Sequence, residues 1–420
     1  MLDKEIVGKN IANYRKRKFI TQKELATLLN ITAQSVSKWE AGLSLPTVDM
    51  LYDVAQVLDV SVDSLLSDKV ADNRDICYED TGLDIRTLYG LKHKIDTLVT
   101  EDESVLHAHY VDPVLFKVDT EGMEEPVFAM TLNVPGSKAR LARERGCDKE
   151  ICMDVTARAI NNVLRYGFVP KILRAQVVCG NKDTRQLEEM ALGFKQICEE
   201  NGVVFSGMEI SGQPINYRVN EYEVSVSLVA AADRKNIVIG ENIQEGDVLI
   251  GLMTPGIEAN CYPFVRVMLD RKPELAYEKL DDEHYLVEEI LKPNVAFTHS
   301  ILGLQKAGIL NGVCRVEASF LYKGSYVGVV PDGLGVKVDM GAIPLKPLYK
   351  FLLEQDMVGK NFFPFRFSMG VGLLVIVSGN RVTEALKIIG KHNEAHILGK
   401  IQTMEENHNE KVWTEGKVKW

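Results

Sequence analysis

The sequence predicts a multi-domain protein in which an all-α domain of five helices precedes an α/β (α+β) body made of two halves. Three observations lead to this prediction. Five short helical patterns with capping residues fill roughly the first 70 residues, and a polar stretch without periodicity follows at 67–74. Beyond it, patterns of buried strands alternate with helical patterns. The length of 420 residues is sufficient for two or three domains.

The stretch from Thr21 to Trp39 predicts two helices joined by a short turn. Thr21 is a favourable N-cap, and Glu24 three residues later completes a capping box. Asn30 tolerates the left-handed backbone that the turn needs, and Thr32 caps the second helix. Apolar residues repeat at helical spacing on the inner side, so polar residues occupy the outer side of the second helix.

Three further helices are expected around this pair. One runs from Glu5 to Arg17 and ends in a basic run, one begins after Thr47 and continues to Leu58, and a short one follows Ser61. Residues 34–42 read Q-S-x-S-K-W-E-x-G, with Gln22 at the front of the preceding helix. The five helices together resemble the Cro/cI-repressor-like (XRE) family of helix-turn-helix domains.

This resemblance implies that the head binds a double-stranded DNA operator. The residues expected to contact DNA are Arg15, Arg17, Gln22, Thr32, Ala33, Gln34, Ser35, Ser37 and Lys38. Gln22 would touch phosphate, while the second helix would face base edges in the major groove. Residues 1–41 hold eight Lys and Arg against four Asp and Glu, which agrees with phosphate binding. An all-helical protein-interaction domain is the alternative interpretation.

Composition limits the other classes of function. The chain carries a net charge of −10, which argues against wholesale coating of nucleic acid. No apolar run approaches the length of a membrane span, and the charged N-terminus does not read as a signal peptide. Seven cysteines without CxxC spacing favour a reducing, cytoplasmic location over disulfides or zinc.

In the body, strands and helices are expected in alternation. The expected strands are Val127–Leu132, Val203–Phe205, Glu223–Ala230, Val248–Leu252 and Gly372–Val377. The expected helices are Ile151–Tyr166, Thr184–Asn201, Ala259–Asp270 and Val382–His392. A turn at Glu245–Asp247 marks the boundary between two halves. The expected domains are therefore a head at 1–69, a linker at 70–75, body halves at 76–243 and 244–405, and a tail at 406–420.

Six short motifs lie in register along the body. They are Tyr78–Ile85 (Y-x-D-x-G-V-D-I), Asp154–Asn162 (D-L-V-A-M-x-V-N-D), Gly180–Asp183 (G-K-x-D), Gly246–Arg266 (G-D-V-L-I-G-L-x-S-S-G-x-H-S-N-G-Y-S-L-V-R), Leu291–Pro293 (L-x-P) and Phe367–Gly372 (F-N-M-G-I-G). With these motifs, residues 76–400 resemble phosphoribosylformylglycinamidine cyclo-ligase, the aminoimidazole ribonucleotide (AIR) synthase of purine synthesis. The resemblance implies an AIR-synthase-like fold and a dimer formed through the sheet of the first half.

The same comparison shows where the chain departs from the family's chemistry, which uses Mg-ATP. The family motif G-T-D-G-V-G-T-K is replaced at 131–138, so that its Asp becomes Asn133 and Pro135 removes a backbone N–H. The family's N-D becomes Asn161-Asn162, and an amide offers Mg²⁺ no charge. A family His becomes Glu258, and the H-x-T-G-G-G motif is replaced by bulkier residues at 315–320.

The sequence therefore predicts a transcriptional regulator with a degenerate AIR-synthase-like domain that senses an effector and forms a homodimer. ATP or another small phosphorylated purine-type ligand is the expected effector, Mg²⁺ is expected to bind weakly, and no membrane is involved. The expected ligand-binding residues are Ser137, Lys138, Asn161, Lys182, Asp183 and Asn260. No catalytic or metal-binding residue is assigned. The alternatives are a bifunctional cyclo-ligase that still closes the imidazole ring with ATP, and a structural dimer that binds no ligand.

Overall fold

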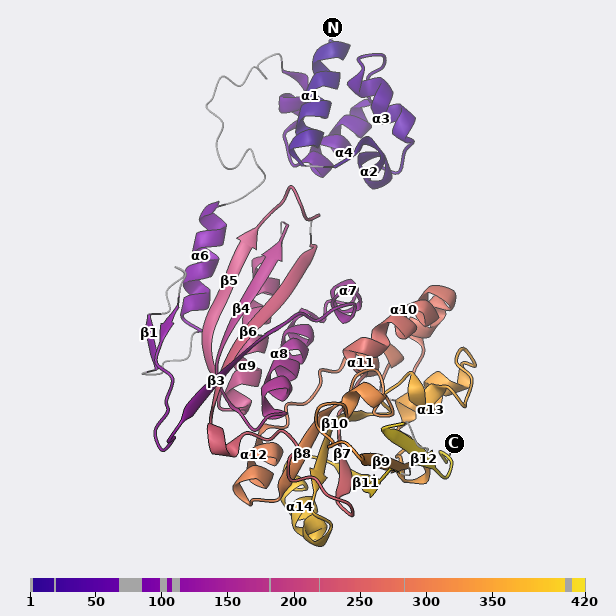
Figure 1. Ribbon diagram of the computed structural model, residues 1–420. Helices are drawn as coiled ribbons and strands as arrows, with labels where there is room; N and C mark the ends of the chain where they lie inside the picture. Colours follow the sequence, from indigo (N-terminus) through magenta and orange to yellow (C-terminus); the bar gives the residue numbers. More distant parts are fainter. Residues whose placement is uncertain are drawn as a thin grey trace. The chain divides into compact units, whose positions relative to one another are not determined.

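The computed structural model describes residues 3–18, 20–67, 85–98, 104–107, 114–180, 183–218, 220–282, 284–404 and 410–419 (Figure 1). The chain divides into two compact units. The first comprises residues 1–90 with 178–183 and 210–222, and the second comprises residues 91–177, 184–209 and 223–420. The expected linker and positions 78–84 of the first family motif lie outside the described residues. The expected domain boundaries stay predictions.

The head consists of the five expected helices. They are α1 (Lys4–Arg17), α2 (Gln22–Leu28), α3 (Ala33–Glu40), α4 (Val48–Leu58) and α5 (Val62–Leu66). The capping box predicted between Thr21 and Glu24 is confirmed, because the backbone N–H of each residue donates to the side chain of the other. Thr32 caps α3 as predicted. Asn30 has a φ of 54°, which confirms the left-handed turn between α2 and α3.

Helix α1 and the C-terminal end of α3 approach each other closely at Gly8. A Cβ atom added at Gly8 would lie only 2.1 Å from the carbonyl oxygen of Trp39, so only glycine fits at this point of α1. Val36 has no solvent exposure and packs in the same core as Ile11 and Leu25. Apolar packing therefore fixes the inner face of α3, and the residues on its outer face are not part of the core.

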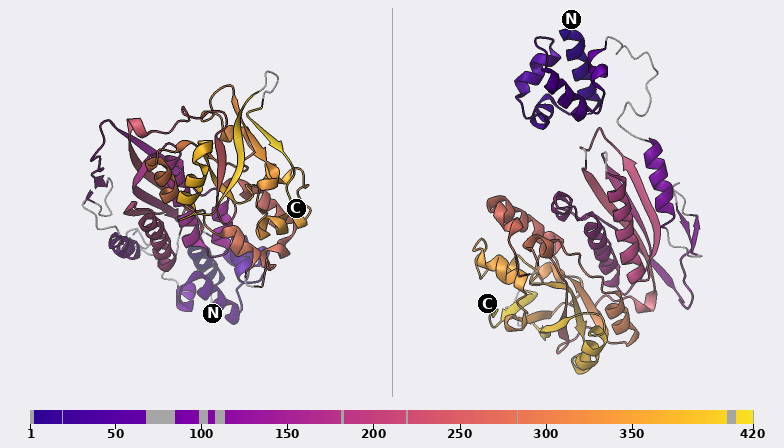
Figure 2. Two further views of the ribbon diagram at one scale, coloured as in Figure 1. Left: turned by 90° about the horizontal axis from the view of Figure 1, so that it is seen from below. Right: turned by 180° about the vertical axis from the view of Figure 1, so that it is seen from behind.

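The first half of the body contains a four-stranded sheet with the order β3-β6-β4-β5. The strands are β3 (Pro126–Asn133), β4 (Val169–Cys179), β5 (Val204–Gly212) and β6 (Tyr222–Asp233), with the short pair β1 (Val105–His107) and β2 (Leu115–Phe116) before them. The helices are α6 (Ile85–Asp96), α7 (Lys138–Glu144), α8 (Asp148–Leu164) and α9 (Thr184–Glu200). Helices α8 and α9 pack together and cover one face of the sheet (Figures 1 and 2).

The other face of β3 is apolar and exposed. Phe128, Met130 and Leu132 alternate along the strand and are 54%, 77% and 70% exposed. Met130 pairs with Val229 of the antiparallel neighbour β6, so the apolar surface extends across two strands. Side chains of this size are normally covered, which makes this face a candidate contact surface.

The second half contains a six-stranded mixed sheet with the order β12-β9-β11-β7-β10-β8. Its strands are β7 (Val248–Met253), β8 (Leu310–Arg315), β9 (Leu334–Asp339), β10 (Val371–Val377), β11 (Ala395–Thr403) and β12 (Val412–Glu415). Its helices are α10 (Tyr262–Arg271), α11 (Leu286–Leu291), α12 (Thr298–Lys306), α13 (Pro347–Glu354) and α14 (Val382–Ile389). Strand β10 lies between β7 and the edge strand β8 and is almost entirely buried, as a continuous apolar run predicts.

The expected strands and helices of the body are all present, two of them with altered bounds, and the structure contains further elements that the sequence does not predict. The strand expected at 203–205 is nine residues long as β5, because its second part contains polar residues that conceal the pattern. The helix expected from Ala259 starts as a 3₁₀ turn, η3 (Ala259–Cys261), before α10 begins. Strand β4 was not expected, since Lys171, Arg174 and Gln176 interrupt its apolar positions.

Candidate functional site

The outer face of α3 is polar and accessible. The exposed residues of this segment are Thr32, Ala33, Gln34, Ser37 and Lys38. Thr32 Oγ1 also accepts the backbone N–H of Ser35 at 3.2 Å, so these two side chains take part in the cap. The helix thus offers a polar front on a rigid base, which is the arrangement that reading a DNA groove requires.

Arg15 and Gln22, both expected at the DNA, have an internal role in the head. Arg15 Nε and Nη2 donate to the carboxylate of Glu40 at 2.5 and 2.9 Å, and Nη1 donates to the carbonyl of Ile20 at 2.6 Å. Gln22 Nε2 donates to the same carboxylate at 2.8 Å. Burial raises the pKa of Glu40, but the hydrogen bonds from Arg15 and Gln22 outweigh it and hold the pKa below its ordinary value. This cluster joins α1, α2 and α3, and DNA contacts by its members stay predictions.

The remaining cations of the head are on its surface. Arg17 is half-buried, with its guanidinium 5.2 Å from the ring centroid of Tyr14. Lys16, Lys18 and Lys38 are exposed. Surface cations next to the front of α3 are suited to phosphate contacts.

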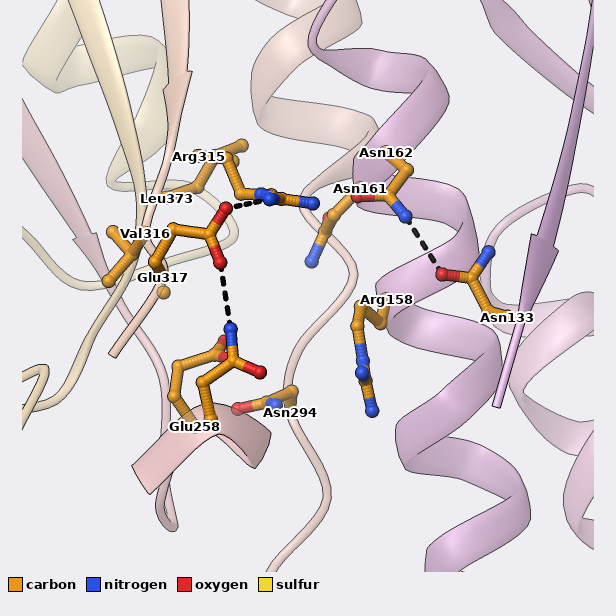
Figure 3. A pocket seen from close by; sticks show the side chains of 12 residues that line it. Asn133, Arg158, Asn161, Asn162, Glu258, Asn294, Arg315, Val316, Glu317 and Leu373 are labelled. Carbon is orange, nitrogen blue, oxygen red and sulfur yellow. Dashed lines mark hydrogen bonds and ion pairs between the residues drawn. The ribbon is translucent and has the colours of Figure 1, made fainter. Parts of the chain in front are cut away.

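A polar cleft of about 240 Å³ lies in the body (Figure 3). Its side chains come from the end of β3, from α8, from η3, from β10 and from the chain after β8. The lining residues are Asn133, Arg158, Asn161, Asn162, Glu258, Asn260, Asn294, Arg315, Val316, Glu317, Gly372 and Leu373. Two of the expected ligand-binding residues, Asn161 and Asn260, are among them.

Amide side chains in the cleft are largely engaged with protein groups. Asn162 Nδ2 donates to Asn133 Oδ1 at 2.8 Å, and Asn260 Nδ2 donates to Glu317 Oε2 at 2.8 Å. Asn161 donates to the carbonyl of Val295 and accepts the backbone N–H of residue 297. Asn161, on α8 of the first half, therefore connects that helix to residues 295–297 of the second half by two hydrogen bonds.

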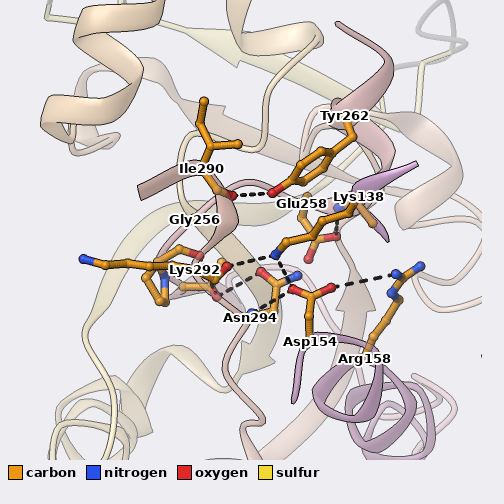
Figure 4. Close-up of polar contacts among 12 residues, drawn as sticks. Lys138, Asp154, Arg158, Gly256, Glu258, Tyr262, Ile290, Lys292 and Asn294 are labelled. Carbon is orange, nitrogen blue, oxygen red and sulfur yellow. Dashed lines mark hydrogen bonds and ion pairs between the residues drawn. The ribbon is translucent and has the colours of Figure 1, made fainter. Parts of the chain in front are cut away.

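Lys138, expected to bind a ligand, is instead fully buried beside the cleft (Figure 4). Its Nζ donates to Asp154 Oδ1 at 2.5 Å and to the carbonyl of Lys292 at 2.9 Å. The ammonium also lies 5.5 Å from the ring centroid of Tyr262. These contacts satisfy most of its hydrogen-bonding capacity, and they give Lys138 a structural role.

Glu258, which stands where the family has His, is a weak acid in this environment. Burial raises its pKa, and the nearby Asp154 charge adds to the rise. Arg158 and Lys138 oppose it, and the pKa is about 7. Near neutral pH this side chain therefore exchanges between neutral and charged forms within the cleft.

Two arginines of the cleft, Arg158 and Arg315, are not among the ligand-binding residues expected from the sequence. Arg158 stands where the family motif D-L-V-A-M-x-V-N-D has Met, and Arg315 stands where H-x-T-G-G-G has His. A cation in place of an apolar residue, on a helix that otherwise follows the motif, was the available signal. The remaining expected residues do not line the cleft: Ser137 and Asp183 are exposed, and Lys182 lies outside the described residues. No group of three His, Cys, Asp or Glu is placed to hold a metal ion within the described ranges.

These features define a helical head with the helix-turn-helix arrangement and an α/β body with two sheets. Residues 11–65 match the Helix-turn-helix family. The body is 28% identical over 336 residues to phosphoribosylformylglycinamidine cyclo-ligase of Bifidobacterium longum subsp. infantis, a match that covers 77% of this chain and 95% of the relative. The enzyme of the same name from Bacillus subtilis is 27% identical over 332 residues, with the same coverage.

Solved structures agree on the fold of the body. Thiamine-monophosphate kinase from Stenotrophomonas maltophilia superposes with a TM-score of 0.56 at 13% identity, covering 78% of this chain and 96% of its own. The hydrogenase maturation protein HypE from E. coli superposes with a TM-score of 0.54 at 12% identity, covering 79% and 94%. In the described part of the chain, no helix is both long and apolar enough to cross a membrane.

Proposed function

We propose that this protein is a DNA-binding transcriptional regulator whose body senses an effector and holds two copies of the chain together. The head supports the first part, because α3 combines a buried inner face with an accessible polar front. The observation that carries the second part is the hydrogen-bonded pair of amides, Asn133 and Asn162, in the cleft of the body. The cytoplasmic location expected from the sequence belongs to the same proposal.

The amide pair does not fit the Mg-ATP chemistry that the resemblance implies. Magnesium in nucleotide sites is held by carboxylates together with phosphate oxygens. Here Asn162 gives a hydrogen to Asn133, so the two amides satisfy each other and bring no negative charge. Asp154, the carboxylate nearby, is paired with Lys138. The cleft is thus better suited to holding a ligand than to activating one.

A homodimer is supported by the exposed face of β3. Phe128, Met130 and Leu132 form an apolar strip on a sheet, and a second copy of the same strip is a self-complementary partner. Two joined heads suit an operator with two half-sites about one helical turn apart. Met130→Glu should convert the dimer to a monomer in analytical ultracentrifugation, whereas Leu192→Glu, at an exposed position on α9, should leave it intact.

Regulation follows if the effector prefers one arrangement of the two heads. A ligand shifts operator affinity only by the difference between its affinities for the two arrangements. A purine nucleotide or an intermediate of purine synthesis is the proposed effector, by analogy with the cyclo-ligases that the body resembles.

The test begins with selection of genomic DNA fragments by the full-length protein, followed by footprinting on the selected sequence. The double variant Gln34→Ala/Lys38→Ala should lose the specific footprint while remaining dimeric. An unchanged footprint would contradict the DNA-binding assignment. A thermal-shift panel of purine nucleotides then tests the sensor, because absence of any shift would leave a structural dimer that binds no ligand.

A bifunctional cyclo-ligase is the second candidate. The observation in its favour is that the similarity extends over 95% of the length of the Bifidobacterium enzyme. Turnover of formylglycinamidine ribonucleotide with Mg-ATP by the purified chain would establish it, provided that an Asn260→Ala variant purified in parallel, altered at a cleft position where the family residue is retained, loses the activity.

A further inference from the structure

Three arginines gather around the cleft described above. Arg158 comes from the middle of α8, Arg165 follows the end of that helix, and Arg315 ends β8. Figure 3 shows Arg158 and Arg315 entering the same space from opposite sides. Burial lowers the pKa of Arg315, and the nearby charges of Arg165 and Arg158 lower it further. Repulsion between these positive charges raises the free energy of the folded protein, and a bound anion would lower it.

Donor groups at this point have no acceptor within the described residues. Nε and Nη2 of Arg158 are buried and make no hydrogen bond, and Nη2 reaches only to 4.0 Å from Asp154 Oδ2. Asn294 also lines the cleft and is 95% buried. Its side-chain nitrogen makes no hydrogen bond. Leaving buried donors unpaired is costly, so a bound group that accepts from them gains free energy.

The carboxyl groups near the arginines either form ion pairs within the protein or are only partly ionised at neutral pH. Glu317 pairs with Arg315, and Asp154 pairs with Lys138 through Oδ1 and, at 4.0 Å, with Arg158 through Oδ2. Glu258 is the remaining carboxyl group of the cleft lining, and its pKa of about 7 leaves it only partly ionised at neutral pH. These seven side chains, Arg165 included, have a net charge of +2 with Glu258 protonated and +1 with Glu258 ionised.

We infer that the cleft holds the phosphate group of a phosphomonoester between Arg158 and Arg315, with Asn294 as a third donor. A dianionic phosphate balances the net charge, and guanidinium groups present paired N–H donors that match its oxygens. The small volume of the cleft accommodates the phosphate and the sugar next to it, so the rest of a larger ligand lies at the opening. This inference rests on the proposed sensor role and replaces Lys138 with Arg158 as the phosphate contact.

Calorimetric titration of the full-length protein tests the inference. Inorganic phosphate, ribose 5-phosphate, AMP and adenosine are the probes. The phosphate-containing probes should bind and adenosine should not, and tighter binding of ribose 5-phosphate than of inorganic phosphate would identify a phosphorylated ligand as the source of the anion. Binding of adenosine as tight as that of AMP would overturn the inference, as would absence of binding by every phosphate probe.

Arg158→Met is the central variant, and Arg271→Met, at an exposed position on α10, is its matched control. Arg158→Met should weaken AMP binding by roughly 10-fold to 100-fold, the range for lost charge-assisted hydrogen bonds. Its thermal stability without ligand should equal or exceed that of the parent, because a guanidinium whose buried Nε and Nη2 make no hydrogen bond has been removed. If Arg158 were instead a structural partner of Asp154, the variant would be less stable and would keep its affinity.

Operator binding by the same variants separates this inference from the proposed function. If Arg158→Met loses AMP binding but AMP never alters operator affinity in the parent, the phosphate site stands and the sensor role fails. If the parent binds its operator but no phosphate probe, the regulator stands and the phosphate site fails.

Discussion

Nζ of Lys138 lies 2.5 Å from Oδ1 of Asp154, and neither side chain has any solvent exposure. The same Asp154 oxygen accepts the backbone N–H of Asn294 at 3.0 Å, while Lys138 donates to the carbonyl of Lys292. The pair therefore joins α7 and α8 of the first half of the body to the segment 292–294 of the second half (Figure 4). A buried ion pair in this position fixes how the walls of the cleft face each other.

Removal of the cation should destabilise the body strongly. Lys138→Met leaves Asp154 buried without a counter-ion, and the expected loss in the free energy of unfolding is about 3–5 kcal/mol. Urea denaturation followed by circular dichroism measures it. The double variant Lys138→Met/Asp154→Leu should recover much of the loss, because two apolar side chains then replace the pair. A single variant within about 1 kcal/mol of the parent would show that the pair does not hold the halves together.

The carboxyl group of Glu258 should make stability depend on pH in the neutral range. Its folded pKa of about 7 exceeds its ordinary value of 4.5, so its contribution is fully present below pH 4.5 and is lost as the pH rises through 7. Glu258→Gln cannot ionise, and it should be more stable than the parent by about 1–3 kcal/mol at pH 8. The difference should vanish near pH 4.5. Thermal unfolding across this range is the measurement, with Glu274→Gln as an exposed control; a constant difference would contradict the prediction.

Two arginines near the end of α1 should behave differently when replaced. Arg15→Ala leaves Glu40 partly buried without its ion pair, so the head should lose about 3 kcal/mol of stability. Arg17→Ala should leave the fold unchanged, weaken DNA binding evenly across sequences and reduce the salt dependence of affinity. Thermal unfolding and fluorescence anisotropy at two salt concentrations separate the effects. Loss of affinity confined to one operator would argue against a phosphate contact by Arg17.

Aspartates in place of the amide pair should create a cation requirement. In Asn133→Asp/Asn162→Asp, two carboxylates would replace groups whose hydrogen bond is 2.8 Å long, and their repulsion should lower stability in the absence of divalent ions. Mg²⁺ should restore it and bind measurably in calorimetry. Equal stability with and without Mg²⁺ would mean that these positions do not correspond to the family's metal ligands.

The head was more predictable than the body for a physical reason. Its helix ends are set by local hydrogen bonds, such as the capping box of Thr21 and Glu24, and these depend on residues three positions apart. Strand β4 is held between β5 and β6, which are distant in sequence, and the polar residues within β4 make its own pattern ambiguous. The family resemblance supplied the architecture of the body where periodicity did not.

The candidate sites were predictable only in part for the same reason. Asn161 and Asn260, which belong to motifs that the chain retains, line the cleft, and ligand binding by them stays a prediction. The sequence patterns do not predict the ion pair of Lys138 with Asp154, because the two residues lie on different helices. Arg158 is not predictable from the family motif, because the family has an apolar residue at this position and the motif therefore assigns it no ligand contact.

The contact of Gly8 with the carbonyl of Trp39 has a consequence for how a target sequence is chosen. A methyl group added at Gly8 would clash with this carbonyl group, so α3 would have to move away from α1. The angle at which the reading helix would enter a groove is therefore encoded in a residue that never meets a base. The orientation of α3 therefore depends on the absence of a side chain at position 8 as well as on the apolar side chains that pack beneath the helix.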